Sequence, residues 1–213
     1  MRDLKTMLQQ HVSHLRQQQY QVDELTFAPP ASEADLLALE AELGLALPAS
    51  LRKVLGTLSS HVAFHWSAPP DTTYPVPFQS SFSGKLHWSL AALRLCEQEK
   101  KGWIANCFPD RDDACDAVWH DKLAFMAVDN GDYLAIDLAP DSHGTIVYLS
   151  HDDGEGHGRA LAENMESLLD RWAPLACPGG EDWQWLPFCE DGGMITPDQA
   201  TGRAWRAMLG LAP

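Results

Sequence analysis

Two short stretches concentrate the side chains that could do chemistry. Residues 128–138 read V-D-N-G-D-Y-L-A-I-D-L, and residues 150–157 read S-H-D-D-G-E-G-H. Closely spaced carboxylates and imidazoles can bind a metal ion, or can share the proton transfers of acid/base hydrolysis. The two stretches therefore raise the question whether they form a catalytic centre or only the turns of a β-sheet.

The spacing in the second stretch does not fit a known type of metal centre. His151 and His157 are separated by a Gly-rich loop that holds Asp152, Asp153 and Glu155. A catalytic zinc site takes ligands from rigid elements, such as the helical H-E-x-x-H motif, and a calcium loop alternates its acidic ligands. Neither pattern occurs in this stretch. A solvated loop is the simpler interpretation, and a metal-dependent hydrolase that uses this loop is kept as an alternative.

The sequence supports acid/base or nucleophilic catalysis no better than it supports a metal centre. Asp129 and Asp132 flank a tight turn, where Asp is common because its carboxylate bonds nearby backbone N–H groups. The sequence has no G-x-S-x-G motif, no P-loop and no C-x-x-C pair among its five Cys. We therefore expect a protein that is not an enzyme and that uses no cofactor and no bound metal.

The first stretch has the features of a β-hairpin. Asn130 and Gly131 predict a two-residue turn, because both tolerate positive φ. That turn sets these cross-strand pairs: Ala127 with Leu134, Phe125 with Ile136, and Leu123 with Leu138. Their apolar side chains would share one face of the sheet, with Asp137 opposite Ala124 on the other. Residues 145–150 predict a third strand, and hence an antiparallel meander that helices cover on one side.

Other elements are predicted from periodicity and caps. Ser32 with Asp35 resembles a capping box, and Gly44 suits the C-terminal cap of the same helix. The alternation of residues 61–66 predicts a strand, whereas the Pro- and Ser-rich residues 67–84 predict an irregular excursion. Helical spacing predicts the following further helices: residues 3–20, 51–58, 88–107, 161–172 and the last segment of the chain, preceded by an extended segment at 183–188.

Composition restricts the class of partner. The 213 residues include 30 acidic and 15 basic ones, a formal charge of −15, and 45% are apolar, enough for a sizeable core. An acidic surface repels phosphate backbones and anionic lipids, which argues against nucleic-acid or membrane binding and favours a cationic protein partner. The first residues lack a signal-peptide core and the Cys spacing favours reduced thiols, so a cytoplasmic location is expected.

Three motifs, in this order, resemble the SMI1/KNR4 family of the SUKH superfamily. The first is S-E-A-D-L-L-A-L-E-A-E-L-G-L-A-L-P-A-S-L-R-K-V-L, two helices joined by an L-G-x-x-L-P link. The second is W-H-D-K-L-A-F-M-A-V-D-N-G-D-Y-L-A-I-D-L. The third is G-T-I-V-Y-L-S-H-D-D-G, followed by the helix A-L-A-E-N-M-E-S-L-L-D-R-W. Their order and spacing carry the resemblance.

The resemblance implies an α+β fold with a central antiparallel β-sheet flanked by α-helices. We expect a single domain over residues 1–213, with a family-like core at about 32–173, an N-terminal helix at 3–20 and a C-terminal extension at 174–213. The family has no shared catalytic residues to transfer to this sequence, in agreement with the absence of catalytic motifs.

The resemblance also implies a function. Bacterial members are mostly thought to be immunity proteins, so we expect a binding protein that neutralises the toxin domain of a polymorphic or contact-dependent system, with a basic nuclease as one candidate. The alternative is a regulatory or scaffold module, as in eukaryotic members. Whether the chain is a monomer or a homodimer stays open. The charge of the chain predicts that the contact residues are surface acids: Asp110, Asp112, Asp113, Asp129, Asp132, Asp152, Asp153 and Glu155.

Overall fold

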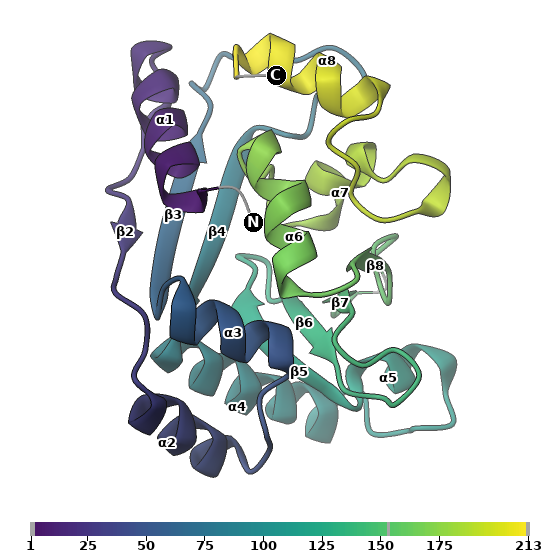
Figure 1. Cartoon of the computed structure of the whole chain (residues 1–213). Coiled ribbons are helices and arrows are strands. Elements are labelled where there is room, and N and C mark those ends of the chain that lie inside the picture. Colours follow the sequence, from purple (N-terminus) through teal and green to yellow (C-terminus); the bar gives the residue numbers. More distant parts are fainter. Residues whose placement is uncertain (1–2, 153, 212–213) are drawn as a thin grey trace.

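Two antiparallel sheets of four strands each make up the framework of the residues that the computed structural model describes, 3–152 and 154–211 (Figure 1). In the first sheet, β3 pairs with β4 on one edge and with two short strands on the other. Its strands are β1 (Gln21–Val22), β2 (Thr26–Phe27), β3 (His61–Ser67) and β4 (Ser83–Ser89). The second sheet is a meander of β5 (Lys122–Ala127), β6 (Tyr133–Asp137), β7 (Ile146–Leu149) and β8 (Ala160–Ala162). The predicted fold class is confirmed.

Helices cover both sheets, and Figure 1 shows α4 crossing below them and α6 packed in front of the meander. The α-helices are α1 (Leu4–Gln17), α2 (Glu33–Leu43), α3 (Ala49–Thr57), α4 (Leu90–Asn106), α5 (Ala114–Trp119), α6 (Met165–Trp172), α7 (Asp182–Trp185) and α8 (Ala200–Leu209). Short 3₁₀ turns follow α6 and α7: η1 (Ala173–Leu175), η2 (Leu186–Phe188) and η3 (Glu190–Gly192). None of the helices in the described part is long and apolar enough to cross a lipid bilayer.

The predicted caps of α2 are confirmed. The Ser32 hydroxyl accepts from the backbone N–H of Asp35, and the Asp35 carboxylate accepts from the backbone N–H of Ser32, so both halves of the capping box form. Gly44 ends the helix in the left-handed conformation with φ of 73°. Such caps satisfy backbone groups that a helix end would otherwise leave without a partner.

The predicted register of the β5–β6 hairpin is wrong. Only Gly131 of the turn has positive φ, and the N–H of Val128 donates to the Asp132 carbonyl at 2.8 Å, which makes a three-residue loop. A bulge at Phe125 shifts the pairing further, so Leu123 lies opposite Ile136. The pairs at the far end of the hairpin change as well: Lys122 lies opposite Asp137, and Ala124 opposite Ala135.

Three segments differ from their predicted state. The sequence predicts an irregular excursion and a helix where β4 lies, yet β4 pairs with β3 over its whole length, and α4 begins only at Leu90. Leu161 is predicted in a helix, but it lies in β8, because Asn164 caps α6 by accepting from the Ser167 N–H. Residues 183–188 are helical, in α7 and η2, rather than extended.

Apolar side chains pack on both faces of the second sheet, so the prediction of a sheet covered on one side is wrong. Leu123, Phe125 and Ile136 belong to the main core, whereas Ala124 and Ala135 face a smaller cluster with Trp119. Every residue of β6 and β7 is buried for this reason. The smaller cluster consists of Cys96, Phe108, Trp119, Ala124, Tyr133, Ala135, Val147 and Leu149, with Trp103, Ile104, Val118 and Ala127 packed against it.

The N-terminal helix α1 and the C-terminal helix α8 both pack on the main core and contact each other. Trp205 of α8 is fully buried, and its indole N–H donates to the Leu175 carbonyl at 2.9 Å. A His14 ring nitrogen of α1 lies 2.9 Å from the Leu209 carbonyl of α8. Elements outside the family-like core are therefore part of the packing that supports it.

Candidate functional site

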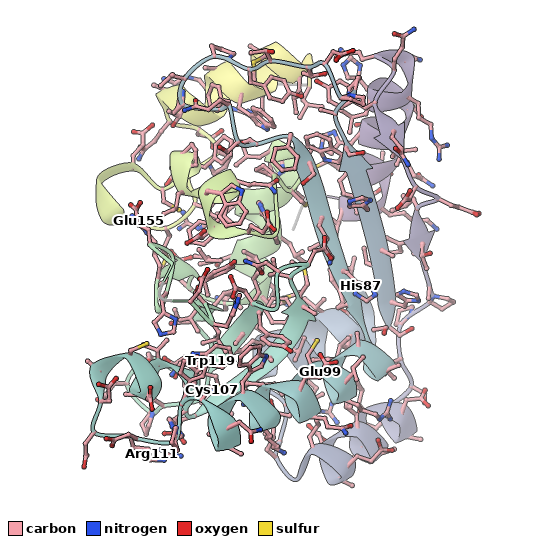
Figure 2. The ribbon with its side chains drawn as sticks, turned by 180° about the vertical axis from the view of Figure 1, so that it is seen from behind. His87, Glu99, Cys107, Arg111, Trp119 and Glu155 are labelled. Carbon is pink, nitrogen blue, oxygen red and sulfur yellow. The ribbon has the colours of Figure 1, made fainter. Side chains whose placement is uncertain are left out.

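Two acidic segments that are distant in the sequence lie side by side, and we call residues 110–116 and 151–157 the acidic loops. The N–H of Ser150 donates to Nδ1 of His157 at 3.0 Å, so Nδ1 is the acceptor and the ring proton is on Nε2. Nε2 lies 3.1 Å from the Cys115 carbonyl and donates to it. Figure 2 shows Arg111 of one loop and Glu155 of the other on the same side of the molecule.

The carboxylates of the first acidic loop hold its backbone in shape. Asp113 is the N-cap of α5, and its Oδ1 accepts from the N–H groups of Cys115 and Asp116 at 2.8 and 3.1 Å. Asp116 Oδ2 accepts from the N–H of Asp110, and Asp110 Oδ1 accepts from the N–H of Asp112. These bonds fix where the acids lie without neutralising them, because a backbone N–H carries no net charge.

The second acidic loop is supported by the C-terminal extension. Asp182 of α7 is 6% exposed, and its Oδ2 accepts from the N–H of Gly156 at 2.8 Å. A Cβ on Gly156 would come within 2.5 Å of the Asp182 Cβ, and one on Gly154 within 2.6 Å of its Oδ2. Only glycine permits this close approach, so the two glycines allow Asp182 to reach the backbone of Gly156, next to exposed Glu155.

Asp132 is buried, so its prediction as a surface acid is wrong. Its side chain is 2% exposed. Oδ1 accepts from the backbone N–H of His151 at 2.8 Å and lies 2.6 Å from the His151 ring, while Oδ2 accepts from Tyr148 and Asn130 at 2.6 and 2.8 Å. The short loop turns this carboxylate inward, where it ties the hairpin to the start of the second acidic loop.

The same bonds bear on the metal-dependent alternative. Oxygen and nitrogen atoms of Asp132, His151 and Asp152 lie within 4.8 Å of one another, a spacing that would suit an ion. Four partners already surround the two oxygens of Asp132, one for each lone pair. His157 is directed at Cys115 instead, so the two imidazoles of the loop do not converge. Asp132, His151 and Asp152 are therefore arranged as in a hydrogen-bonded turn.

The other predicted contact residues have different surroundings. Asp110, Asp112, Asp113, Asp152 and Glu155 are exposed in the acidic loops. Asp129 is also exposed but lies 2.5 Å from the ammonium of Lys85 on β4. Asp153 lies outside the described residues.

The exposed acids of the two loops share one electrostatic property. Among the described residues, none of Asp110, Asp112, Asp113, Asp152 and Glu155 forms an ion pair, and the neighbouring guanidinium of Arg111 pairs with Asp121 at 2.9 Å. The hydroxyl of Ser150 donates to Asp152 at 2.7 Å and lowers the pKa of that carboxyl, which keeps it ionised. The loops therefore present negative charge that the rest of the described chain does not neutralise.

An aromatic group beside the loops was not identified from the sequence. The indole of Trp103 in α4 is half-buried, with ring centroids of Trp119 and His151 at 6.2 and 5.3 Å. The hydroxyl of Tyr133 donates to Oε2 of Glu99 at 3.1 Å. No sequence pattern joins residues this far apart, although a Trp at the polar end of an amphipathic helix is a weak signal of a surface role.

A large groove lies elsewhere, between α1 and α8, with a volume of about 790 Å³. Two of its polar side chains already have partners within the chain: a ring nitrogen of His11 lies 3.0 Å from the Ala173 carbonyl, and Arg206 lies 3.1 Å from Asp198. Burial lowers the pKa of His11, which favours its neutral form. Neither His11 nor the paired Arg206 therefore offers a free charge to a ligand in this groove.

Comparison with known proteins identifies the family of the chain. No curated protein matches the chain. The sequence model of the SMI1 / KNR4 family (SUKH-1) matches residues 30–171, which include α2 and extend to α6. The matched part holds both acidic loops, whereas Asp182, which supports one of them, lies beyond it. Because the match covers well over half of the sequence, the chain belongs to the SMI1 / KNR4 family (SUKH-1).

Proposed function

We propose that this chain is a non-enzymatic immunity protein that binds a cognate toxin domain through its acidic loops. Membership of the SMI1 / KNR4 family supports a binding role, since bacterial members are mostly thought to be immunity proteins. The charge of −15 supports a cationic partner, and a cytoplasmic location would place the chain where a toxin acts after entry.

The observation that carries the proposal is the exposed, unpaired charge of the two loops. Asp110, Asp112, Asp152 and Glu155 are exposed and form no ion pair with the described residues. Their backbones are fixed by the Asp113 cap and by Asp182, so little conformational entropy is lost when a partner binds. Carboxylates placed in this way raise the association rate of a cationic protein and orient it.

A nuclease toxin would be inhibited if these carboxylates bound in its substrate cleft. A nuclease lines its substrate cleft with cations that contact phosphate groups. Carboxylates of the acidic loops, in place of those phosphates, would occupy the same cations and exclude nucleic acid. This mechanism needs no catalytic residue in the immunity protein.

The test is affinity capture from the native lysate with matched charge variants. The acidic-loop variant carries Asp110→Asn, Asp112→Asn, Asp152→Asn and Glu155→Gln, which keep the acceptor oxygens but remove the charge. The control variant changes four carboxylates that are paired with Arg or Lys elsewhere, Glu33, Glu42, Glu163 and Glu166, each to Gln. Both variants lose the same net charge.

The wild type and the control variant should retain a protein that carries a toxin domain, and the acidic-loop variant should not. Growth of cells that co-express the captured toxin domain should be rescued in the same pattern. Capture of a housekeeping protein instead would replace the immunity function by the regulatory or scaffold alternative. Equal capture of a toxin domain by both variants would show that the acidic loops are not its binding surface.

A further inference from the structure

A hollow of about 550 Å³ lies between the end of α4 and the β5–β6 turn. Figure 2 shows Glu99 in α4 and Cys107 just past its end, on the face viewed from behind. The hollow is lined by Glu99, Gly102, Trp103, Asn106, Cys107, Gly131 and Tyr133. It adjoins the acidic loops, because the indole of Trp103 lies between the hollow and His151.

One wall of this hollow is an aromatic side chain held in place from behind. Ring contacts with Phe108, Trp119 and His151, at 6.2, 6.2 and 5.3 Å between centroids, fix the indole of Trp103. A Cβ on Gly131 would come within 3.7 Å of that indole, and φ of 100° at this position already disfavours any other residue. Glycine at this position therefore leaves the wall uncovered.

The rim of the hollow carries an exposed carboxylate without an ion pair among the described residues. Glu99 accepts from Tyr133 through Oε2, and its Oε1 accepts no hydrogen bond from the described part of the chain. Lys100 and Lys101, which follow it in α4, both pair with Glu97 instead. Burial and the nearby Glu99 raise the pKa of Tyr133, so this phenol stays protonated and keeps the carboxylate in position.

A carboxylate and a fixed indole that line the same hollow are a combination suited to a guanidinium. The carboxylate accepts charge-assisted hydrogen bonds, and the flat cation stacks on the ring. Asn106 adds an acceptor: one N–H of its amide donates to the Gly102 carbonyl at 2.7 Å, which fixes the side chain, and its carbonyl oxygen accepts no hydrogen bond from the described residues. We propose that the Trp103 hollow receives an arginine side chain of the protein partner, an inference that rests on the proposed function.

The experiment is an NMR titration of the ¹⁵N-labelled full chain at low salt with N-acetyl-arginine N-methylamide. The matching citrulline derivative, which has nearly the same shape and no charge, is the control ligand. The indole N–H of Trp103 and the amides of Gly102 and Gly131 should shift with arginine. Glu99→Gln should weaken binding roughly tenfold, the effect of removing one charge-assisted bond, whereas Glu24→Gln, an exposed acid elsewhere, should leave it unchanged.

Two results would overturn the inference. Equal shifts with the citrulline derivative would mean that no cation is recognised. Shifts confined to the acidic loops, with Trp103 unmoved up to tens of millimolar, would mean that arginine is attracted only by the general charge. Neither result depends on the identity of the partner, so the two proposals are tested separately. The hollow can fail to bind arginine although a toxin domain is captured, and it can bind arginine although no toxin domain is captured.

Discussion

The carboxylates of the α2–α3–α6 surface and those of the acidic loops differ in their partners: the first form ion pairs, and the second accept hydrogen bonds from uncharged groups. On the helical surface, Arg52 lies 2.5 Å from Glu33 and 3.2 Å from Glu40, and Lys53 lies 2.6 Å from Glu166. In the loops, the carboxylates accept from backbone N–H groups and hydroxyls. The first arrangement neutralises charge within the molecule, and the second leaves it available to a partner.

The difference shows why net charge alone does not locate a binding surface. The formal charge of −15 is a property of the whole sequence, but paired acids contribute little to the field that an approaching protein meets. Acids that hold turns and caps retain their charge. Substitutions in the two regions should therefore have different effects on stability, on carboxyl pKa values and on partner binding.

Asp132→Ala should lower the free energy of unfolding by about 3 kcal/mol, because it removes the acceptor of several buried or half-buried donors. Tyr148 would be left with a buried hydroxyl that has lost its partner. Asp129→Ala, three residues away and exposed, is the matched control and should cost less than about 1 kcal/mol. Chemical denaturation measures both, and equal losses would contradict the structural role of Asp132.

Gly156→Ala should destabilise the protein by about 2 kcal/mol, because the added methyl group overlaps Asp182 and the ring of Trp185. Gly102→Ala is the control and should affect stability in the opposite direction, because a Cβ there meets nothing within 4 Å and Ala favours a helix. It should leave stability unchanged or raise it by up to about 1 kcal/mol. A stable Gly156→Ala variant would mean that α7 does not hold the second acidic loop.

Arg52→Gln should raise the pKa of Glu33, which the guanidinium of Arg52 holds below its ordinary value. Because the folded-state pKa is depressed, this carboxylate stabilises the fold above the pKa of the unfolded chain, and the contribution is lost as the pH falls through the folded-state pKa. NMR titration of the side-chain carboxyl measures the shift. No change of the Glu33 pKa in the variant would contradict the pairing.

The acidic-loop variant should have the stability of the wild type within about 0.5 kcal/mol, since its exposed carboxylates form no ion pair and the amides keep the acceptors. Thermal unfolding at neutral pH provides the comparison. A large loss of stability would show that the charges themselves hold the loops, and the loops would then resemble the helical surface.

Local signals in the sequence were sufficient for the elements that local chemistry determines. Ser32, Asp35 and Gly44 predict both ends of α2, and the alternation of residues 61–66 predicts β3. The Asn130-Gly131 pair was ambiguous, because Gly131 alone can supply the positive φ of a three-residue loop. The bulge at Phe125 has no local signature, so the register could not be obtained.

The candidate site depends on contacts between distant residues, which a single sequence does not show. The acidity of both loops is evident from the sequence, but that Asp132 turns inward and that Asp182 reaches Gly156 are tertiary facts. The same holds for Glu99 and Tyr133, which meet because α4 packs on the second sheet, mainly on β5. Residue type therefore predicted the chemistry of the surface, and packing decided which of its acids are exposed.

The central claim is that the acidic loops bind a cationic partner, and the most direct measurement is the association rate with the captured toxin domain at low and physiological salt. The account predicts that the acidic-loop variant associates roughly tenfold more slowly than the wild type at low salt, with a weaker dependence on salt. The variant of Glu33, Glu42, Glu163 and Glu166 should remain close to the wild type. Equal rates for the two variants would contradict the claim.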